Sequence, residues 1–226
     1  MTIAALNGSP RGMQSNSNEI LELLRQLDGA GLQWITVSTI RELRNAGTAQ
    51  SSASRLPEIP ADLLSANCLL LVFPLYVDSL PASFMRYLDA YAAARAAAGV
   101  TAAQRVFVVS NCGFYEGEQN ACALRICQNF CIANGLDWCG GIGFGTGEMI
   151  RGLRAVPPQA AIRQPLFAAL EELHGAITDP VGRLSKNIFT QHKFPWILYK
   201  LMGEAGWRRQ AKTNGLKAAS LAAQPY

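Results

Sequence analysis

The chain has 226 residues, of which 50% are hydrophobic and 16% are charged. This composition is too apolar for a disordered chain, and the length suits one large domain, with or without an appendage. The longest apolar run, residues 68–73, falls far short of the roughly 20 residues that a membrane-spanning helix requires. No basic stretch precedes the first apolar residues, so we identify no signal peptide and expect a cytoplasmic protein.

Charge is distributed unevenly along the chain. The 20 Lys and Arg residues and 16 Asp and Glu residues leave a net charge of +4. From residue 186 onward seven cations oppose only Glu204, so this segment carries +6 and residues 1–185 carry −2. A mildly acidic body argues against a broad nucleic-acid surface. The six cysteines do not suit a small disulfide scaffold in a chain of this length, and we expect reduced thiols.

The predicted elements alternate between strand and helix. Apolar runs predict strands over residues 2–6, 32–37, 68–73, 105–110 and 136–144. Helices are predicted around Ile20 to Leu27, between Pro81 and Gly99, and over residues 118–133 and 158–174, whereas residues 38–60 show no strong period and are expected to be irregular.

Parallel strands need crossover connections of a dozen or more residues, and the predicted helices supply them. The alternation therefore predicts an α/β fold, a doubly wound five-stranded parallel sheet with helices on both faces. The composition becomes basic and aromatic after residue 179. We therefore place a domain over residues 1–180 and a helical, basic C-terminal tail over residues 181–226.

The loop after the first strand, residues 7–17, combines short polar residues with Arg11 directly before a helix. Backbone N–H groups at a helix start lack partners and carry partial positive charge, and serine hydroxyls add further donors. The loop therefore predicts an anion site suited to a phosphate. The alternative is a capping box of Asn16 and Glu19, which explains the helix start but not the Ser-Pro-Arg run before it.

Two further loops are aromatic where exposed loops are usually polar. Residues 74–81, after the third strand, suit a flat apolar ring near Tyr76, although Leu75, Tyr76 and Leu80 alternatively pack beneath the next helix. Residues 111–117 follow the fourth strand and mix polar and aromatic side chains. In an open α/β sheet the ligand lies beyond the carboxyl ends of the strands, so we expect these loops to converge.

Three other groups of residues are given no catalytic or metal-binding role. The glycines at the end of the fifth strand lack the spacing of a known phosphate loop, and we interpret them as a close backbone approach or, equally, a flexible surface turn. Cysteines at three helical positions spread around the axis and are expected to be small buried hydrophobes. The two histidines lie away from the three loops. These residues are Gly140, Gly141, Gly143, Gly145, Gly147, Cys122, Cys127, Cys131, His174 and His192.

The loop sequences resemble the flavodoxin-like NAD(P)H-dependent FMN reductase family. The resemblance is carried by Asn7-Gly8-Ser9-Pro10-Arg11, Ser15-Asn16-Ser17, Pro74-Leu75-Tyr76 and Leu80-Pro81-Ala82, and it covers about residues 1–175. It implies bound FMN, with NADPH or NADH as co-substrate. It assigns the FMN phosphate to Ser9, Arg11, Ser15, Asn16 and Ser17, and the flavin ring to Pro74, Leu75, Tyr76, Val77, Asn111, Cys112 and Gly113. Residues 38–60 lack the cysteine cluster of related iron–sulfur flavoproteins.

The resemblance implies an enzyme that passes reducing equivalents from NAD(P)H to a small acceptor such as a quinone, a nitro compound or a flavin. A flavodoxin-type electron carrier and a flavin-free phosphate-binding or membrane-associated module are the alternatives. Carriers are usually smaller and acidic, which favours the enzyme.

The tail has its own set of expected partners. Its residues Leu198, Leu201 and Met202 share a helical face that could cover the body of the protein, join subunits or lie on an anionic membrane surface. We expect first a homodimer contact and second a weak contact with an anionic membrane surface. No nucleic-acid partner is expected.

Overall fold

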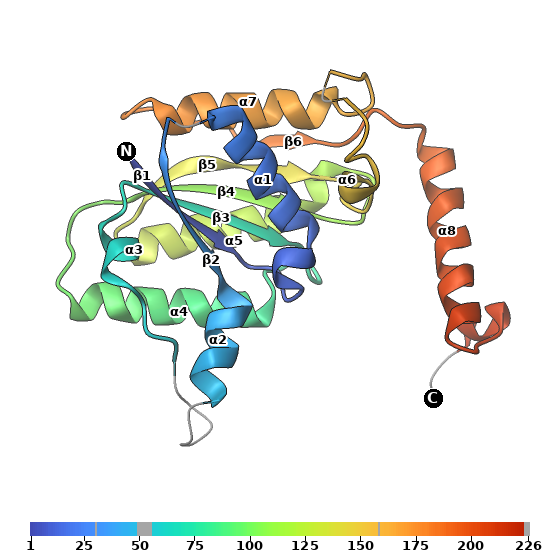
Figure 1. The fold of residues 1–226 in the computed structure, drawn as a ribbon, viewed down its shortest axis with the longest axis horizontal. Coiled ribbons are helices and arrows are strands. Elements are labelled where there is room, and N and C mark those ends of the chain that lie inside the picture. Colours follow the sequence, from blue (N-terminus) through green and yellow to red (C-terminus); the bar gives the residue numbers. More distant parts are fainter. Residues whose placement is uncertain (30, 49–55, 158, 224–226) are drawn as a thin grey trace. The chain divides into compact units, whose positions relative to one another are not determined.

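The computed structural model describes residues 1–29, 31–48, 56–157 and 159–223. The chain divides into two compact units, residues 1–192 and residues 193–226. The first unit contains a parallel sheet of six strands in the order β2-β1-β3-β4-β5-β6 (Figure 1). This order is that of a flavodoxin-like doubly wound α/β fold with one added edge strand.

Five of the strands lie where the apolar runs predict them. The sixth differs from the prediction, because β6 is a strand of three residues that pairs with β5. A segment this short leaves no hydrophobic period in the sequence. Residues 181–192, which contain β6, belong to the first compact unit. The sequence suggested a boundary between domain and tail near residue 180. The strands are β1 (Thr2–Asn7), β2 (Gln33–Ser38), β3 (Cys68–Pro74), β4 (Arg105–Asn111), β5 (Asp137–Phe144) and β6 (Ile188–Thr190).

The helices agree less closely with the sequence pattern. They are α1 (Asn16–Asp28), α2 (Thr39–Thr48), α3 (Ala61–Ser65), α4 (Ala82–Ala97), α5 (Ala121–Ala133), α6 (Met149–Gly152), α7 (Gln164–Thr178) and α8 (Trp196–Thr213), with 3-10 turns η1 (Gly12–Gln14), η2 (Gly117–Asn120) and η3 (Ala218–Ala222). Among the described residues, none of these helices combines the length and apolar character needed to cross a bilayer.

Two helix predictions need correction. The stretch over residues 38–60 was expected to be irregular, but it contains α2, which places Leu43 against the core. Residues 49–55 of that stretch lie outside the described residues, as does Pro158 at the expected start of α7. Helix α7 begins only at Gln164, because residues 159–163 form turns.

The sheet is covered on both faces, as the uninterrupted apolar run of β3 predicts. Alternate residues of a strand point to opposite faces. Leu69, Leu71 and Phe73 pack with α4 and α5. Cys68, Leu70 and Val72 pack with α1 and α7 on the other side (Figure 1). The two cores hold the strand ends in place, and these ends carry the loops described below.

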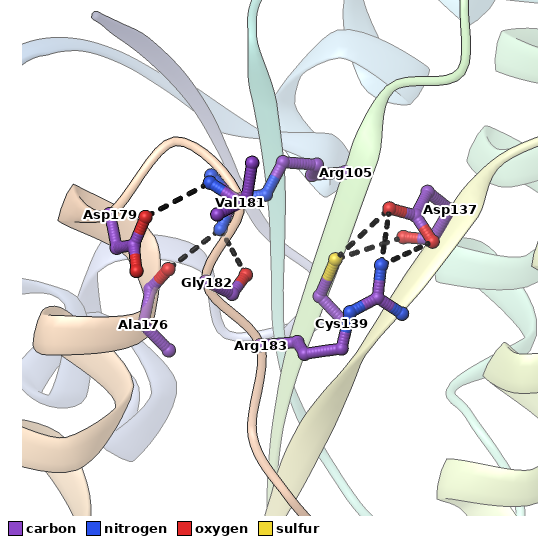
Figure 2. A network of polar contacts seen from close by, with 8 residues as sticks. All are labelled: Arg105, Asp137, Cys139, Ala176, Asp179, Val181, Gly182 and Arg183. Atoms are coloured by element: carbon purple, nitrogen blue, oxygen red, sulfur yellow. Dashed lines mark hydrogen bonds and ion pairs between the residues drawn. The ribbon is translucent and has the colours of Figure 1, made fainter.

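Arg105, the first residue of β4, fastens the end of α7 to the sheet (Figure 2). Its guanidinium donates hydrogen bonds to the backbone oxygens of Ala176 at 2.6 Å, Ile177 at 3.3 Å and Gly182. The last carbonyls of a helix have no partner within the helix, and a cation there also complements the helix dipole. The arginine thereby anchors the segment that leads into β6.

Replacing Arg105 with methionine should lower the free energy of unfolding by about 2 kcal/mol or more, because three carbonyl groups lose a charged donor. The matched control is Arg183→Met, which removes an exposed guanidinium that lies 3.1 Å from Asp137. An exposed ion pair of this kind is worth less than about 1 kcal/mol. Urea denaturation of both variants measures the difference, and equal losses would contradict the anchoring role.

Candidate functional site

A pocket opens at the carboxyl edge of the sheet, where the loops after β1, β3 and β4 meet. Strands β1 and β3 are neighbours, and the chain leaves them in opposite directions, which is the arrangement that creates a crevice in doubly wound folds. The lining residues come from these loops and from the turn after β5. They are Ser9, Arg11, Ser15, Asn16, Ser17, Pro74, Leu75, Tyr76, Asn111, Cys112, Gly113, Gly147 and Glu148.

The pocket brings together eleven of the twelve residues that the sequence suggested as a binding site. The exception is Val77, which does not line it and whose side chain is 98% exposed. Two lining residues, Gly147 and Glu148, were missed. The glycine-rich run signalled a close approach near Gly147, whereas nothing in the sequence singles out Glu148.

Asn7, the last residue of β1, shapes the first loop. Its buried side-chain amide donates to the carbonyl of Gly12 at 3.1 Å, and its Oδ1 accepts from the backbone N–H of Ser9 at 3.0 Å. The hydroxyl of Thr39 in turn donates to the carbonyl of Asn7 at 3.0 Å. These bonds hold the loop in shape by contacts within the protein.

Ser15, rather than the expected Asn16, caps helix α1. Its hydroxyl accepts from the N–H of Asn18 at 3.1 Å and donates to the carbonyl of Gly12 at 2.6 Å. The proton of the Ser15 hydroxyl is therefore committed to the loop itself. The first-turn N–H groups of Asn16 and Ser17 belong to residues that line the pocket, so the positive end of the helix faces it.

Asn111, at the end of β4, joins three elements at the base of the pocket. Its buried side-chain amide donates to the hydroxyl of Ser17 at 3.0 Å and to the carbonyl of Phe73 at 3.0 Å. Its carbonyl accepts from the N–H of Leu75 at 2.8 Å. Because the Ser17 oxygen acts as the acceptor, its own proton is available for a ligand.

The loop after β3 forms a tight reverse turn. Tyr76 and Ser79 exchange backbone hydrogen bonds of 2.9 and 3.1 Å, and the central residues Val77 and Asp78 have φ values of +49° and +59°. Two positive φ values define a type I′ turn, which is strained for a β-branched valine. The turn leaves Tyr76 44% exposed at the pocket, whereas Leu80 is buried in the core. Packing beneath the helix therefore explains Leu80 but not Tyr76.

The loop after β4 is bound to the turn after β5. The amide of Asn120 donates to Sγ of Cys112 at 3.2 Å, and the N–H of Gly147 donates to the Cys112 carbonyl at 2.7 Å. Burial raises the pKa of the Cys112 thiol, although hydrogen bonds from the backbone of Phe114 and from Asn120 oppose the shift. The pocket therefore contains a neutral thiol at physiological pH. A Cβ at Gly147 would lie 2.7 Å from the Cys112 carbonyl oxygen, so glycine is required there.

The glycine run at the end of β5 is buried and does not form a flexible surface turn. A Cβ on Gly143 would lie 2.6 Å from the ring of Phe189 in β6, and one on Gly117 would lie 2.5 Å from the backbone of Thr190. The glycines therefore allow β6 and the loop before α5 to approach β5. Close approach was one of the two expectations, but here the neighbour is the chain's own sixth strand.

The segment between β5 and α7 contacts the first loop and α1. Arg151 donates to the carbonyl of Gln14 at 3.1 Å, and Arg154 donates to the Glu19 carboxylate at 2.9 Å. Glu19 therefore pairs with a residue far along the chain instead of completing a capping box. This contact places Glu148, which directly precedes α6, at the pocket.

His192 packs against this segment at Thr146 and does not line the pocket. Its backbone N–H donates to the hydroxyl of Thr146 at 2.9 Å, and its Nδ1 lies 3.0 Å from the same oxygen. The imidazole ring packs edge-on against the ring of Phe144, with 4.9 Å between the two ring centroids. Burial lowers the pKa of His192 to about 4; the bond with Thr146 opposes the shift and the charge of Arg163 adds to it.

The cysteines are free thiols. Of the three on α5, Cys127 and Cys131 are buried as expected, but Cys122 is exposed. Within the part of the chain that is described, no group of three or more His, Cys, Asp and Glu residues is placed to hold a metal ion.

Comparison with known proteins gives one family match. A family model described as NADPH-dependent FMN reductase matches residues 1–126. No curated protein sequence matches the chain.

Three solved structures illustrate what the chain is similar to. An NAD(P)H:quinone oxidoreductase from Methanothermobacter marburgensis gives a TM-score of 0.48 at 16% identity, covering 79% of this chain and 96% of that one. An FMN-dependent NADH-azoreductase from Bacillus anthracis gives a TM-score of 0.46 at 14% identity, and the match covers 79% of this chain and 100% of that one. A flavodoxin variant from Pseudomonas aeruginosa gives a TM-score of 0.45 at 13% identity, and the match covers 77% of this chain and 97% of that one.

The low pKa of His192 should make stability depend on pH. The unfolded chain binds a proton at this residue below about pH 6.5, whereas the folded protein does so only near pH 4. The free energy of unfolding should therefore fall by up to about 3 kcal/mol as the pH is lowered from about 6.5 to below 4. Replacing His192 with asparagine should remove that part of the dependence. Urea denaturation at several pH values measures it, and parallel curves for wild type and variant would contradict the assignment.

Proposed function

This chain belongs to the NADPH-dependent FMN reductase family, and from that premise we propose which residues hold the flavin and which acceptor is reduced. The protein is an FMN-dependent oxidoreductase that uses NADPH or NADH. The proposal places FMN across the carboxyl edge of the sheet, in the pocket formed by the three loops. The single observation that carries it is the convergence of those loops on one pocket that contains a helix N-terminus.

The first loop fits a phosphate. The hydroxyl of Ser9 accepts from the N–H of Arg11 at 3.3 Å, and that of Ser17 accepts from Asn111, so each keeps a proton to donate. The exposed guanidinium of Arg11 adds positive charge, and Asn16 and Ser17, whose N–H groups open α1, line the same pocket. Ser15 serves instead as the helix cap, so we assign it a structural role. The donor set therefore suits a dianionic phosphate monoester.

The other side of the pocket fits a planar ring. Tyr76 and Leu75 present apolar surface, and Cys112 and Gly113 line the same part of the pocket. Gly147 keeps this side open, because a side chain there would collide with the Cys112 carbonyl. Pockets that bind cofactors commonly combine apolar walls with a few fixed polar groups.

When bound, FMN supplies hydride acceptance and onward electron transfer in pairs or singly. The task of this chain is then to hold and orient the reactants. Asn7 and Asn111 keep the loops in their binding shape, and Tyr76 borders the ring. The thiol of Cys112 stays protonated because burial raises its pKa, so it contributes polarity without acting as a nucleophile.

The acceptor is proposed to be a small planar molecule of largely apolar character, such as a quinone. Exposed apolar side chains flank the pocket. Phe114 directly follows the lining residue Gly113, Met13 lies within the first loop, and the sulfur of Met85 lies 3.9 Å from the hydroxyl of Ser79 in the β3 turn. Exposed apolar surface beside a binding pocket favours an apolar ligand. The proposal retains the expected cytoplasmic location.

The phosphate assignment predicts a loss of FMN affinity. Arg11→Gln and Ser17→Ala should each raise the Kd for FMN by about 10- to 150-fold, which corresponds to one lost hydrogen bond to a charged group. The control Arg25→Gln removes the same charge from the other end of α1 and should change Kd less than about twofold. Fluorescence titration of the apoprotein with FMN measures these values, and equal effects for Arg11 and Arg25 would refute the assignment.

The acceptor assignment predicts a selective change in turnover. Phe114→Ser should raise KM for a naphthoquinone by about 5-fold or more through lost apolar contact, and should leave NADPH oxidation with ferricyanide unchanged. The control Ile132→Ser removes an exposed apolar residue of α5 that does not line the pocket. Loss of activity with both acceptors, or an equal effect at Ile132, would contradict the apolar acceptor. An FMN-loaded protein that NADPH does not reduce would instead indicate a carrier.

A further inference from the structure

The second unit, residues 193–226, exposes an unusual amount of apolar surface. Helix α8 is fully described, and within it Ala211 alone is buried. Leu201 is 55% exposed and Met202 is 61% exposed, and both tryptophans of the helix, Trp196 and Trp207, are also exposed. A helix of 18 residues whose apolar side chains stay in contact with water is only marginally stable. A surface that buries these apolar side chains would therefore stabilise the helix.

The same unit is strongly basic. Six Lys and Arg residues oppose the single acid Glu204, so residues 193–226 carry +5 while residues 1–192 carry −1. Glu204 is already paired with Arg208 at 3.8 Å. The covering surface must therefore be negatively charged as well as able to accept apolar side chains.

Apolar and basic residues follow one another along one face of α8. Leu198, Leu201 and Met202 have the spacing i, i+3 and i+4 that places side chains on the same face. Arg209 and Lys212, 11 and 14 residues after Leu198, continue that face, since 11 and 14 residues are close to three and four helical turns. The face is apolar in its first half and cationic in its second half.

The tryptophans lie on another side of the same helix. Trp196 and Trp207 are 11 residues apart, and the ammonium of Lys200 lies 5.7 Å from the ring of Trp196. At about 100° per residue, positions 196 and 207 lie roughly 160° to 180° around the helix from Leu198. The tryptophans therefore do not belong to the face that carries Leu198, Leu201 and Met202.

We propose that residues 193–226 bind the surface of an anionic phospholipid bilayer, with the apolar residues at the start of α8 entering the headgroup boundary and the cations of its second half facing lipid phosphates and carboxylates. The cytoplasmic leaflet carries anionic lipids and attracts such basic segments. The proposal is independent of the pocket and its cofactor. It makes the protein a peripheral membrane enzyme.

Two other occupants fit these features less well. A second copy of the tail would bring two +5 segments together, and the −1 body offers little charge to compensate either of them. The phosphates of a nucleic acid would pair with the cations, but they offer no apolar surface to the exposed side chains of Leu198, Leu201 and Met202. A bilayer satisfies both requirements at once.

The test is sedimentation of the full chain with vesicles. Binding to vesicles of phosphatidylcholine with about 30% phosphatidylserine should exceed binding to phosphatidylcholine alone at least about tenfold, and should fall in about 0.5 M NaCl. The triple variant R208Q/R209Q/K212Q should lower binding by about tenfold or more. The matched control R44Q/R86Q/R125Q removes the same net charge from the first unit and should stay within about twofold of wild type.

A second pair of variants tests the apolar contribution. L201Q/M202Q should weaken binding at least about tenfold, whereas Ile132→Gln, at an exposed position of α5, should have little effect. Circular dichroism and urea denaturation verify that the variants remain folded. The proposal is overturned if acidic vesicles bind no better than neutral ones or if the control variants lose as much binding. It is also overturned if the tail forms dimers or retains duplex DNA without binding vesicles.

Discussion

The pocket depends on the parallel pairing of β1 with β3, two neighbouring strands from which the chain departs in opposite directions. Their register places Asn7 beside Val72, so the two strands end nearly level. Gly8 extends the pairing, because its N–H donates to the Val72 carbonyl at 2.8 Å. A side chain at Gly8 would lie 2.5 Å from the ring of Phe84, so glycine lets the first loop rest directly on α4. The edge at which we propose that FMN binds is thus set by backbone pairing and one close contact.

Buried amide side chains convert this edge into a site. Asn7, Asn111 and Asn120 each stand at or near a strand end, and each hydrogen-bonds backbone or side-chain groups of the adjoining loops. Loops held by such internal bonds lose less conformational entropy when a ligand binds. This preorganisation leaves the hydroxyl protons of Ser9 and Ser17 available at the proposed phosphate site. On that proposal, the same amides stabilise the fold and shape the FMN site.

Much of the fold could be predicted because its signals are local. The apolar run of β3 and the helical spacing of Ile20, Leu24 and Leu27 are periodic over segments long enough to recognise. The short strand β6 carries no such signal, since three residues have no measurable period. It exists because Gly143 of β5 lets the ring of Phe189 approach. Helix α2 was missed for a related reason, because Leu43 is a single contact with the core rather than a continuous apolar stripe.

By itself, the sequence determined the α/β alternation, the donor-rich loop before α1 and the basic tail, because composition and spacing are properties of neighbouring residues. Only the tertiary structure decided that Ser15 commits its hydroxyl to a helix cap, that Val77 does not line the pocket, that Glu148 does, and that His192 contacts Thr146. These outcomes depend on hydrogen bonds and packing between residues far apart in the chain. A linear pattern of side chains carries no information about such contacts until the backbone has folded.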